Sequence, residues 1–380
     1  MDWFPAQVGV WLAVGLLAVL AGGCAQDDGA AWELDTEAVT YPALDLTTVP
    51  ALGSHEPLTG RIYGAPPADH RVAVYIRVGG GWWSKPTFDA PLTPIAADRT
   101  FSCDITTGGD DANATRIAAY LLPAGQAAPL AQGEGSLPGA LDPAARASVE
   151  WVRTAEANFR VVRFSGREWA VKTSAGQKVG PGPNYFSDSA LHVWVDDRGR
   201  LHLRLAKRDG RWTCAEVVLR ESLGYGKYIW SLDSRVDALD PRAILGLFTW
   251  DDDPTDAHRE IDLEFARWGD AGDPTNAQFV IQPYETPGNL QRYTQPGVAR
   301  STHAFRWAPD RIFFKSVQGP VLNPAESALT ISTWTYRGGD IPSPGNENAR
   351  MNLWLMQGQP PATGKGAEII IRSFRHVPEP

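Results

Sequence analysis

The sequence predicts an all-β protein in which a small β-sandwich of immunoglobulin-like size precedes a larger double sheet. Short runs of alternating apolar and polar residues recur along the chain, and Gly- and Pro-rich turn signals separate them. No long amphipathic helical pattern interrupts these runs. A Pro-, Gly- and Ala-rich passage near residue 140 divides the runs into two groups, so we expect two domains.

Residues 1–24 have the features of an export signal. An apolar segment over residues 8–20 is shorter than the roughly 20 apolar residues that a membrane-spanning helix needs. Small residues follow it, and the run 20–24 resembles a bacterial lipoprotein processing site in which the thiol of Cys24 is lipidated. We therefore expect an exported protein anchored at the bacterial cell envelope through Cys24. A plain secretory signal and a membrane anchor helix are the alternatives.

The next segments predict a tether, a small domain and a linker. Residues 25–50 are polar and contain Pro with little periodicity, which is typical of a tether. Residues 51–140 hold short strand patterns such as RVAVYIRV (71–78) and RIAAYLL (116–122), as expected for the small β-sandwich. We assign residues 141–150 to a linker.

Residues 151–380 contain a larger number of the same short strand patterns. Their strand candidates include LHVWVDD, RLHLRLAKR, TCAEVVLR, KYIWSLDSRV, AILGLFTW, EIDLEFARW, AQFVIQPY, LTISTWTY, MNLWLM and AEIIIRSFRHV. So many strands without a helix between them indicate a double sheet rather than an α/β fold. Cys103 and Cys214 fall in different domains, and both a disulfide and two buried free thiols remain open.

Composition limits the partners. A formal net charge of -9 and the absence of a Lys/Arg-rich run exclude a general affinity for nucleic acids or anionic membrane surfaces. Fifteen Trp, ten Tyr and thirteen Phe favour a carbohydrate ligand, because exposed aromatic rings stack on sugars. The acidic run 251–256 lacks the Gly and Glu of an EF-hand loop. We expect a monomer without a cofactor, with a structural Ca²⁺ as the one alternative.

Three carboxylates alternate with apolar residues in the stretch HREIDLEFARWG. Because successive side chains on a strand point to opposite faces, Glu260, Asp262 and Glu264 share one face while the residues between them enter the core. Two Glu side chains four residues apart can bring their carboxylates to roughly 5–6 Å, the separation used in retaining glycoside hydrolysis. In that chemistry one carboxylate attacks the anomeric carbon and the other donates a proton to the leaving oxygen. A solvated acidic strand face is the alternative.

Residues 260–265 resemble the catalytic strand of glycoside hydrolase family 16, in the E-x-D-x-E form of the bacterial lichenase (β-1,3-1,4-glucanase) branch. Further segments between residues 214 and 374 resemble family segments in the family's order: 214–216 with 224–228, 246–250, 303–312 and 351–354. The resemblance implies a concanavalin A-like β-jelly-roll sandwich for the larger domain. It also implies that a polysaccharide is the substrate.

The resemblance implies roles for five residues. Glu260 would be the nucleophile, Asp262 the assisting carboxylate and Glu264 the general acid/base. Glu216 would bind substrate hydroxyls, and Trp354 would lie on the concave sheet near the cleft.

Further candidates for substrate contact lie around this motif. His258, Trp268 and Gln282 are candidates because an imidazole, an indole and an amide can each bind a sugar. Core packing is the alternative for Trp268, and simple exposure is the alternative for His258. The sequence also departs from lichenases here. His258 stands where they carry Trp, residues 278–282 stand where they have Asn and Tyr facing the sugar, and Val218 stands where an Arg is expected.

The sequence thus predicts a retaining endo-glycosidase that hydrolyses a β-linked glucan or a related polysaccharide, with the small sandwich as a spacer or binding module. A non-hydrolytic carbohydrate-binding surface lipoprotein is one alternative. A transglycosylase that uses the same carboxylates is another.

Overall fold

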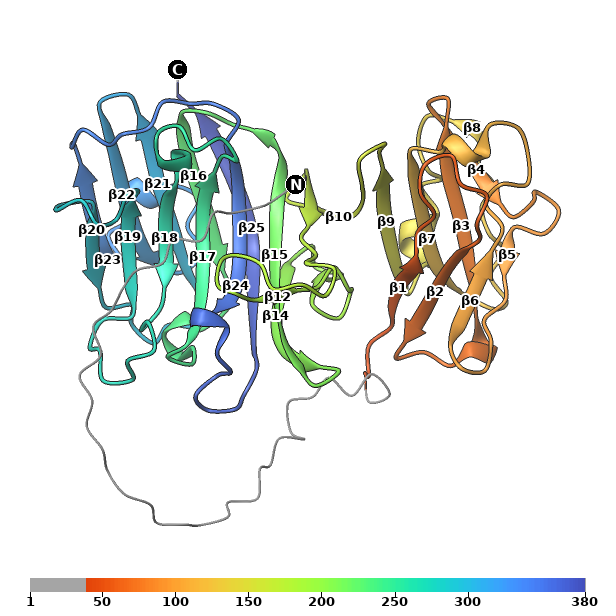
Figure 1. Ribbon diagram of the computed structural model, residues 1–380, viewed down its shortest axis with the longest axis horizontal. Coiled ribbons are helices and arrows are strands. Elements are labelled where there is room, and N and C mark those ends of the chain that lie inside the picture. Colours follow the sequence, from red (N-terminus) through yellow and green to blue (C-terminus); the bar gives the residue numbers. More distant parts are fainter. Residues whose placement is uncertain (1–38, 380) are drawn as a thin grey trace, which may run out of the picture.

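The computed structural model describes residues 39–379, and this part of the chain is almost entirely β-structure (Figure 1). Two two-layered domains lie side by side, the smaller formed by β1–β9 and the larger by β10–β25. The one α-helix among these residues, α1 (Leu141–Ala144), has four residues. No helix in residues 39–379 has the length and apolar character needed to cross a membrane. The predicted all-β fold, a small sandwich followed by a larger jelly-roll sandwich, is confirmed. The expected export signal and Cys24 lie outside the described residues.

The small domain packs a three-stranded sheet against a second sheet. The first sheet has the order β1-β2-β6, and the second has the order β8-β4-β3-β7-β9 with β5 also paired to β3. The bounds are β1 (Ala43–Thr48), β2 (Leu58–Tyr63), β3 (His70–Val78), β4 (Gly81–Lys85), β5 (Leu92–Thr93), β6 (Thr100–Cys103), β7 (Arg116–Pro123), β8 (Gln132–Glu134) and β9 (Ala147–Arg153). Fully buried Leu44, Ile62, Val74 and Ile117 fill the space between the two sheets.

The larger domain packs two antiparallel sheets around a core rich in aromatic rings. The outer sheet has the order β13-β14-β25-β16-β21-β22-β23, and the inner sheet has the order β10-β11-β15-β24-β17-β18-β19-β20. Bounds in the outer sheet are β13 (Val193–Val195), β14 (Leu201–Arg208), β16 (Gly226–Leu232), β21 (Ser301–Ala308), β22 (Arg311–Gln318), β23 (Thr330–Tyr336) and β25 (Ala367–Pro378). Bounds in the inner sheet are β10 (Asn158–Phe164), β11 (Arg167–Val171), β15 (Arg211–Ser222), β17 (Ala243–Trp250), β18 (Ile261–Phe265), β19 (Ala277–Ile281), β20 (Leu290–Tyr293) and β24 (Asn348–Leu355), while β12 (Tyr185–Phe186) pairs in parallel with β15.

One continuous sheet runs through both domains. Strand β9 pairs with β7 of the small domain on one edge and with β10 of the larger domain on the other, so that Val152 lies between Arg116 and Phe159. In Figure 1 the two strands β9 and β10 stand between the domains. Because antiparallel pairs point their side chains to the same side, the register from Ala118 in β7 to Asp262 in β18 defines one common face. We call it the cleft face. The opposite face is covered by β1-β2-β6 in the small domain and by the outer sheet in the larger one.

Two predicted boundaries need correction. The tether was expected to extend to residue 50, but residues 43–48 form β1, because Leu44 and Leu46 enter the small core and Asp45 accepts bonds from Ser189 and Ala190 of the larger domain. The expected linker 141–150 instead contains α1 and the first residues of β9. The Ala- and Pro-rich composition of this segment gave no strand signal, although β9 is paired on both of its edges.

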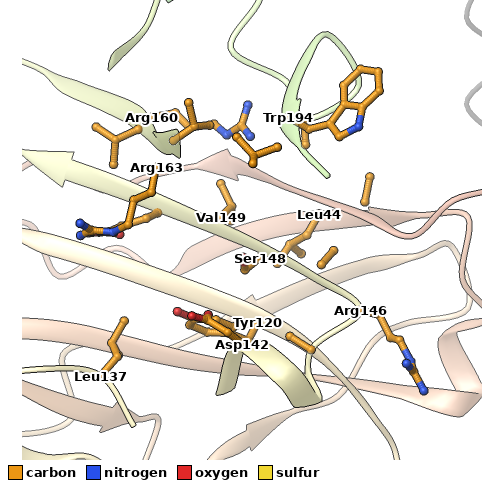
Figure 2. A pocket seen from close by; sticks show the side chains of 18 of the residues that line it. Leu44, Tyr120, Leu137, Asp142, Arg146, Ser148, Val149, Arg160, Arg163 and Trp194 are labelled. Atoms are coloured by element: carbon orange, nitrogen blue, oxygen red, sulfur yellow. Dashed lines mark hydrogen bonds and ion pairs between the residues drawn. The ribbon is translucent and has the colours of Figure 1, made fainter. Parts of the chain in front are cut away.

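The junction between the domains combines ion pairs with a hollow. Arg116 of β7 donates to Glu150 and, at 2.7 and 2.9 Å, to Glu168 of β11, which also pairs with Arg220 of β15. Beside these strands lies a cavity of about 940 Å³, where Trp194 from the larger domain stands across from Tyr120 of the small one (Figure 2). Cys103 and Cys214 are buried free thiols, one in each domain.

Candidate active site

Strand β18 separates a buried apolar face from an acidic face. Ile261, Leu263 and Phe265 are fully buried in the core between the two sheets of the larger domain. Asp262 and Glu264 therefore point to the cleft face, where their cross-strand neighbours are Phe248 and Gly246 of β17 and Val280 and Gln278 of β19. Glu260 immediately precedes β18 with an extended backbone (φ -85°, ψ 123°).

The three carboxylates lie together on the floor of a cleft of about 280 Å³. Its walls come from β15, β17, β24 and the loop after β11. The other residues that line it are Lys172, Gly180, Pro181, Gly182, Glu216, Gly246, Phe248, Trp250, Arg350, Asn352 and Trp354. Of the predicted substrate-binding residues, Glu216 and Trp354 line this cleft. Trp268 lines a second hollow beside Met356, and His258 and Gln282 are half-buried outside the lining of the cleft.

The electrostatics of the carboxylates depend on burial and on one another. Burial, reinforced by the charge of Glu264, raises the pKa of Glu260 to about 8, although a hydrogen bond from Asp262 and the charge of Arg350 act in the opposite direction. Burial raises the pKa of Glu264 to about 7 against the bond from Gln278 and the charge of Arg292. Burial and the charges of Glu260 and Glu264 raise the pKa of Asp262 well above its usual value. Ionising one carboxyl therefore favours a proton on its neighbours, so the site can hold an acid beside a base.

Glu264 is held by a chain of side chains on β19 and β20. Gln278 Nε2 donates to Glu264 Oε2 at 2.6 Å, and Gln278 Oε1 accepts from Trp268 Nε1 at 3.1 Å and from Arg292 Nη1 at 3.2 Å. Trp268, a candidate for substrate contact, donates to Gln278 and packs edge-on against Trp354, with ring centroids 6.1 Å apart.

Gln282 donates a hydrogen bond to Asp262, as Gln278 does to Glu264. Its Nε2 donates to Asp262 Oδ2 at 3.2 Å, and its Oε1 accepts from the backbone N of Tyr284 at 2.9 Å. Both ends of the amide are thus bonded within the protein. Its place in the structure is beside a carboxylate rather than on the cleft surface.

Glu216 lies at the other side of the cleft in a buried polar cluster. Its Oε2 accepts from Lys172 Nζ at 3.0 Å and from Asn352 Nδ2 at 3.4 Å, and its Oε1 lies 3.8 Å from Arg350 Nη1. Only 1% of the Glu216 side chain is exposed, so these cations offset the cost of burying its charge.

A glycine, Gly246, lies in the floor between Asn352 and Glu264. Gly246 pairs with Asn352 on one side and with Glu264 on the other. A Cβ at Gly246 would lie 2.5 Å from Asn352 Oδ1. Because glycine is present, the side chain of Asn352 can lie over position 246 in the floor of the cleft.

Several cleft residues were missed by the sequence analysis. Arg350 and Asn352 alternate with buried Met351 and Leu353, the same signal that identified the acidic strand, and that alternation would have found them. Lys172 follows β11 in a loop without periodicity, and no local signal marks it.

The acidic run 251–256 is bonded within the protein. Asp251 Oδ2 accepts from the backbone N of Asn346 and pairs with Arg259, and Asp256 Oδ2 accepts from Ser343. Among residues 39–379 no group of three or more His, Cys, Asp or Glu side chains is arranged to hold a metal ion.

Comparison with known proteins finds similarity to solved structures alone. No family model and no curated protein matches the sequence. Similar structures include a Bacillus licheniformis β-glucanase, at 20% identity with a TM-score of 0.41 over 56% of this chain and 92% of that chain. A Mycobacterium tuberculosis protein described as a pseudo β-1,3-glucanase is 21% identical, with a TM-score of 0.42 over 56% of this chain and 91% of its own. A glycoside hydrolase family 16 endo-glucanase from Bacteroides ovatus is 13% identical, with a TM-score of 0.41 over 55% and 94%.

Proposed function

We propose that the protein is a retaining endo-glycosidase that hydrolyses a β-linked glucan or a related polysaccharide. One observation carries the proposal: Glu260, Asp262 and Glu264 lie side by side on the floor of one cleft, and two Gln side chains hold two of them in place. The substrate class rests on the resemblance of residues 260–265 to the lichenase strand. By the export signal expected over residues 1–24, the enzyme acts at the cell envelope.

Glu260 is the proposed nucleophile. Its oxygen attacks the anomeric carbon as the bond from that carbon to the leaving oxygen breaks, and a covalent glycosyl-enzyme forms. The hydrogen bond from Asp262 and the charge of Arg350 both lower the pKa of Glu260, so they favour the ionised form that attacks.

Glu264 is the proposed general acid and base. Its pKa near 7 keeps a proton available for the leaving oxygen. Once that proton is transferred, the Glu264 carboxylate takes a proton from water, whose oxygen then attacks the anomeric carbon and releases Glu260. Two displacements at the same carbon retain its configuration.

One observation favours a second function. The raised pKa of Glu260 favours its neutral form, which cannot attack. A protein that binds glycans in this cleft without cleaving them would keep such a neutral, hydrogen-bonding floor. A transglycosylase would use the same residues as the hydrolase, with a sugar hydroxyl in place of water.

Release of reducing ends from a panel of β-glucans, agarose, carrageenan and xyloglucan tests the proposal. We expect release from a β-glucan by the wild-type protein and a loss of at least about a thousandfold in Glu260→Gln, since the nucleophile is removed. Glu221→Gln, on the exposed end of β15, is the matched control with unchanged activity. If the wild-type protein releases no reducing ends from any polysaccharide of the panel but still binds a glycan, the protein is a glycan-binding protein instead. Longer products in the presence of added acceptor sugars would establish the transglycosylase.

A further inference from the structure

A left-handed turn leads directly into the carboxylate strand. Four consecutive residues without a single glycine, Asp256, Ala257, His258 and Arg259, have φ values of 52°, 51°, 62° and 53°. This conformation is unfavourable for residues with a side chain, and a run of four requires that surrounding contacts hold the turn. The turn ends at Glu260, the proposed nucleophile.

Side chains brace the turn at both ends. At its start, Asp256 Oδ2 accepts from the Ser343 backbone N at 3.1 Å and from Ser343 Oγ at 2.7 Å. At its end, Arg259 pairs with Asp251 at 3.0 Å, and the Arg259 carbonyl accepts from Thr249 Oγ1 at 2.8 Å. These contacts leave His258, in the middle of the turn, in one defined position.

The imidazole of His258 stacks on the indole of Trp250. The ring centroids are 4.0 Å apart and the planes differ by 11°. His258 Nδ1 donates to the Asp251 carbonyl at 2.9 Å, because a carbonyl can only accept, and this bond fixes the ring plane. Trp250 lines the cleft together with Glu260, whereas His258 is outside the lining. The imidazole therefore contacts a lining residue of the cleft without being a lining residue itself.

Trp250 lies at the end of a strand, and several side chains contact its indole. It is the last residue of β17, after which the chain leaves the sheet. Its Nε1 donates to Asp252 Oδ1 at 3.2 Å, and the guanidinium carbon of Arg350 lies 5.9 Å from its ring. Stacking on His258 restricts the tilt of the indole about that bond.

We propose that His258 is a positioning residue that holds Trp250 as the aromatic wall of the sugar site beside Glu260. The inference rests on the proposed function and deepens it. An indole wall next to the nucleophile selects a pyranose with a flat apolar face, as in β-linked glucose, because such a ring stacks on an aromatic plane. The sequence made His258 a candidate for direct sugar contact, and the role proposed here acts through Trp250.

Three substitutions separate stacking from the hydrogen bond. His258→Ala removes both, His258→Asn keeps a polar side chain that tolerates the left-handed backbone, and His258→Phe keeps a stacking ring without the donor. With a soluble β-glucan as substrate, we expect KM to rise about tenfold in His258→Ala and His258→Asn with kcat within about twofold, as for a lost aromatic contact. His258→Phe is expected to restore KM to within about threefold of the wild type. His55→Ala, at an exposed His in the small domain, is the matched control.

Binding measured without turnover keeps this test separate from that of the proposed function. In a Glu260→Gln background, calorimetric titration with a β-linked gluco-tetrasaccharide should show the same order of affinities: parent and His258→Phe tight, His258→Ala and His258→Asn weak. This order supports the inference even where the wild type hydrolyses nothing. Equal KM and affinity in His258→Ala would overturn it, and so would rescue by Asn but not by Phe, because the hydrogen bond rather than the stack would then be responsible. Thermal unfolding of each variant identifies any loss that comes from misfolding.

Discussion

Two sets of carboxylates lie on the cleft face of the continuous sheet, and their electrostatics are opposite. At the domain junction, burial acts to raise the pKa of Glu168, but hydrogen bonds from Arg116 and Arg220 outweigh it and lower the pKa to about 2. In the cleft, Glu264 accepts a hydrogen bond from the Gln278 amide and has no ion pair with any of residues 39–379, and burial raises its pKa to about 7. Two Glu side chains on the same face thus have opposite pKa shifts because their neighbouring side chains differ. Carboxylates with Arg partners lie where the domains meet, whereas the cleft carboxylates lie beside one another and can keep a proton among them.

Among the substitutions that compare the two sets of carboxylates, the largest effect is expected where the proposed proton donor is removed. Glu264→Gln should lower hydrolysis of a β-glucan by about a hundredfold or more, because the leaving oxygen loses its acid. Initial rates of reducing-end release measure this effect. Activity in Glu264→Gln within about threefold of the wild type would contradict the assignment.

The pH dependence of stability should separate the two sets. Between pH 4.5 and about 7 the unfolded chain has released the Glu264 proton while the folded state keeps it, so this group destabilises the fold as pH rises. Glu264→Gln should therefore be more stable than the wild type at pH 8, by on the order of 2 kcal/mol, and equally stable at pH 4. Urea unfolding at the two pH values measures the difference. A variant less stable at pH 8 would contradict the raised pKa.

Glu168→Gln should behave in the opposite way. Its lowered pKa contributes stability that is present above pH 4.5 and is lost as pH falls towards 2. At pH 7 the variant leaves Arg116 and Arg220 without their shared carboxylate, and we expect it to be about 1–2 kcal/mol less stable than the wild type, with kcat unchanged. The difference should vanish near pH 2. A loss of activity without a loss of stability would place Glu168 in the cleft chemistry instead.

The smallest expected effect comes from Gln278. Gln278→Met removes the side-chain hydrogen bond that lowers the pKa of Glu264. The alkaline limb of the pH-activity profile should therefore move to higher pH. We also expect about a tenfold lower kcat from the loosened acid. A pH-rate profile of variant and wild type checks both. A limb that moves to lower pH would contradict the role of Gln278.

Alternation in the sequence was enough to predict the acidic strand. Ile261, Leu263 and Phe265 are in the core as the pattern requires, and the carboxylates face the cleft. The same local rule failed for the tether and the linker. The small residues Ala43 and Ala147 begin β1 and β9, and neither strand has a strict alternation of buried and exposed residues. Their burial depends on partner strands far away in the sequence, which alternation does not specify.

The roles of residues around the motif were predicted less well. Trp268 donates to Gln278 and Gln282 donates to Asp262, and neither hydrogen bond could be predicted from the sequence. Alternation along a strand predicts the face of the sheet on which a side chain lies. It does not predict which residues from other strands contact that side chain. Lys172 reaches Glu216 because β11 pairs with β15, a contact between residues 44 positions apart.

The central claim is that Glu260 forms the covalent intermediate. Incubation with an activated 2-deoxy-2-fluoro β-gluco-oligosaccharide slows the breakdown of such an intermediate, and peptide mass spectrometry then locates the bound sugar. We predict a single adduct on the peptide that carries residues 260–265, assigned to Glu260 by fragmentation and absent from Glu260→Gln. An adduct on Glu264, or inverted product with no adduct from an active protein, would contradict the account.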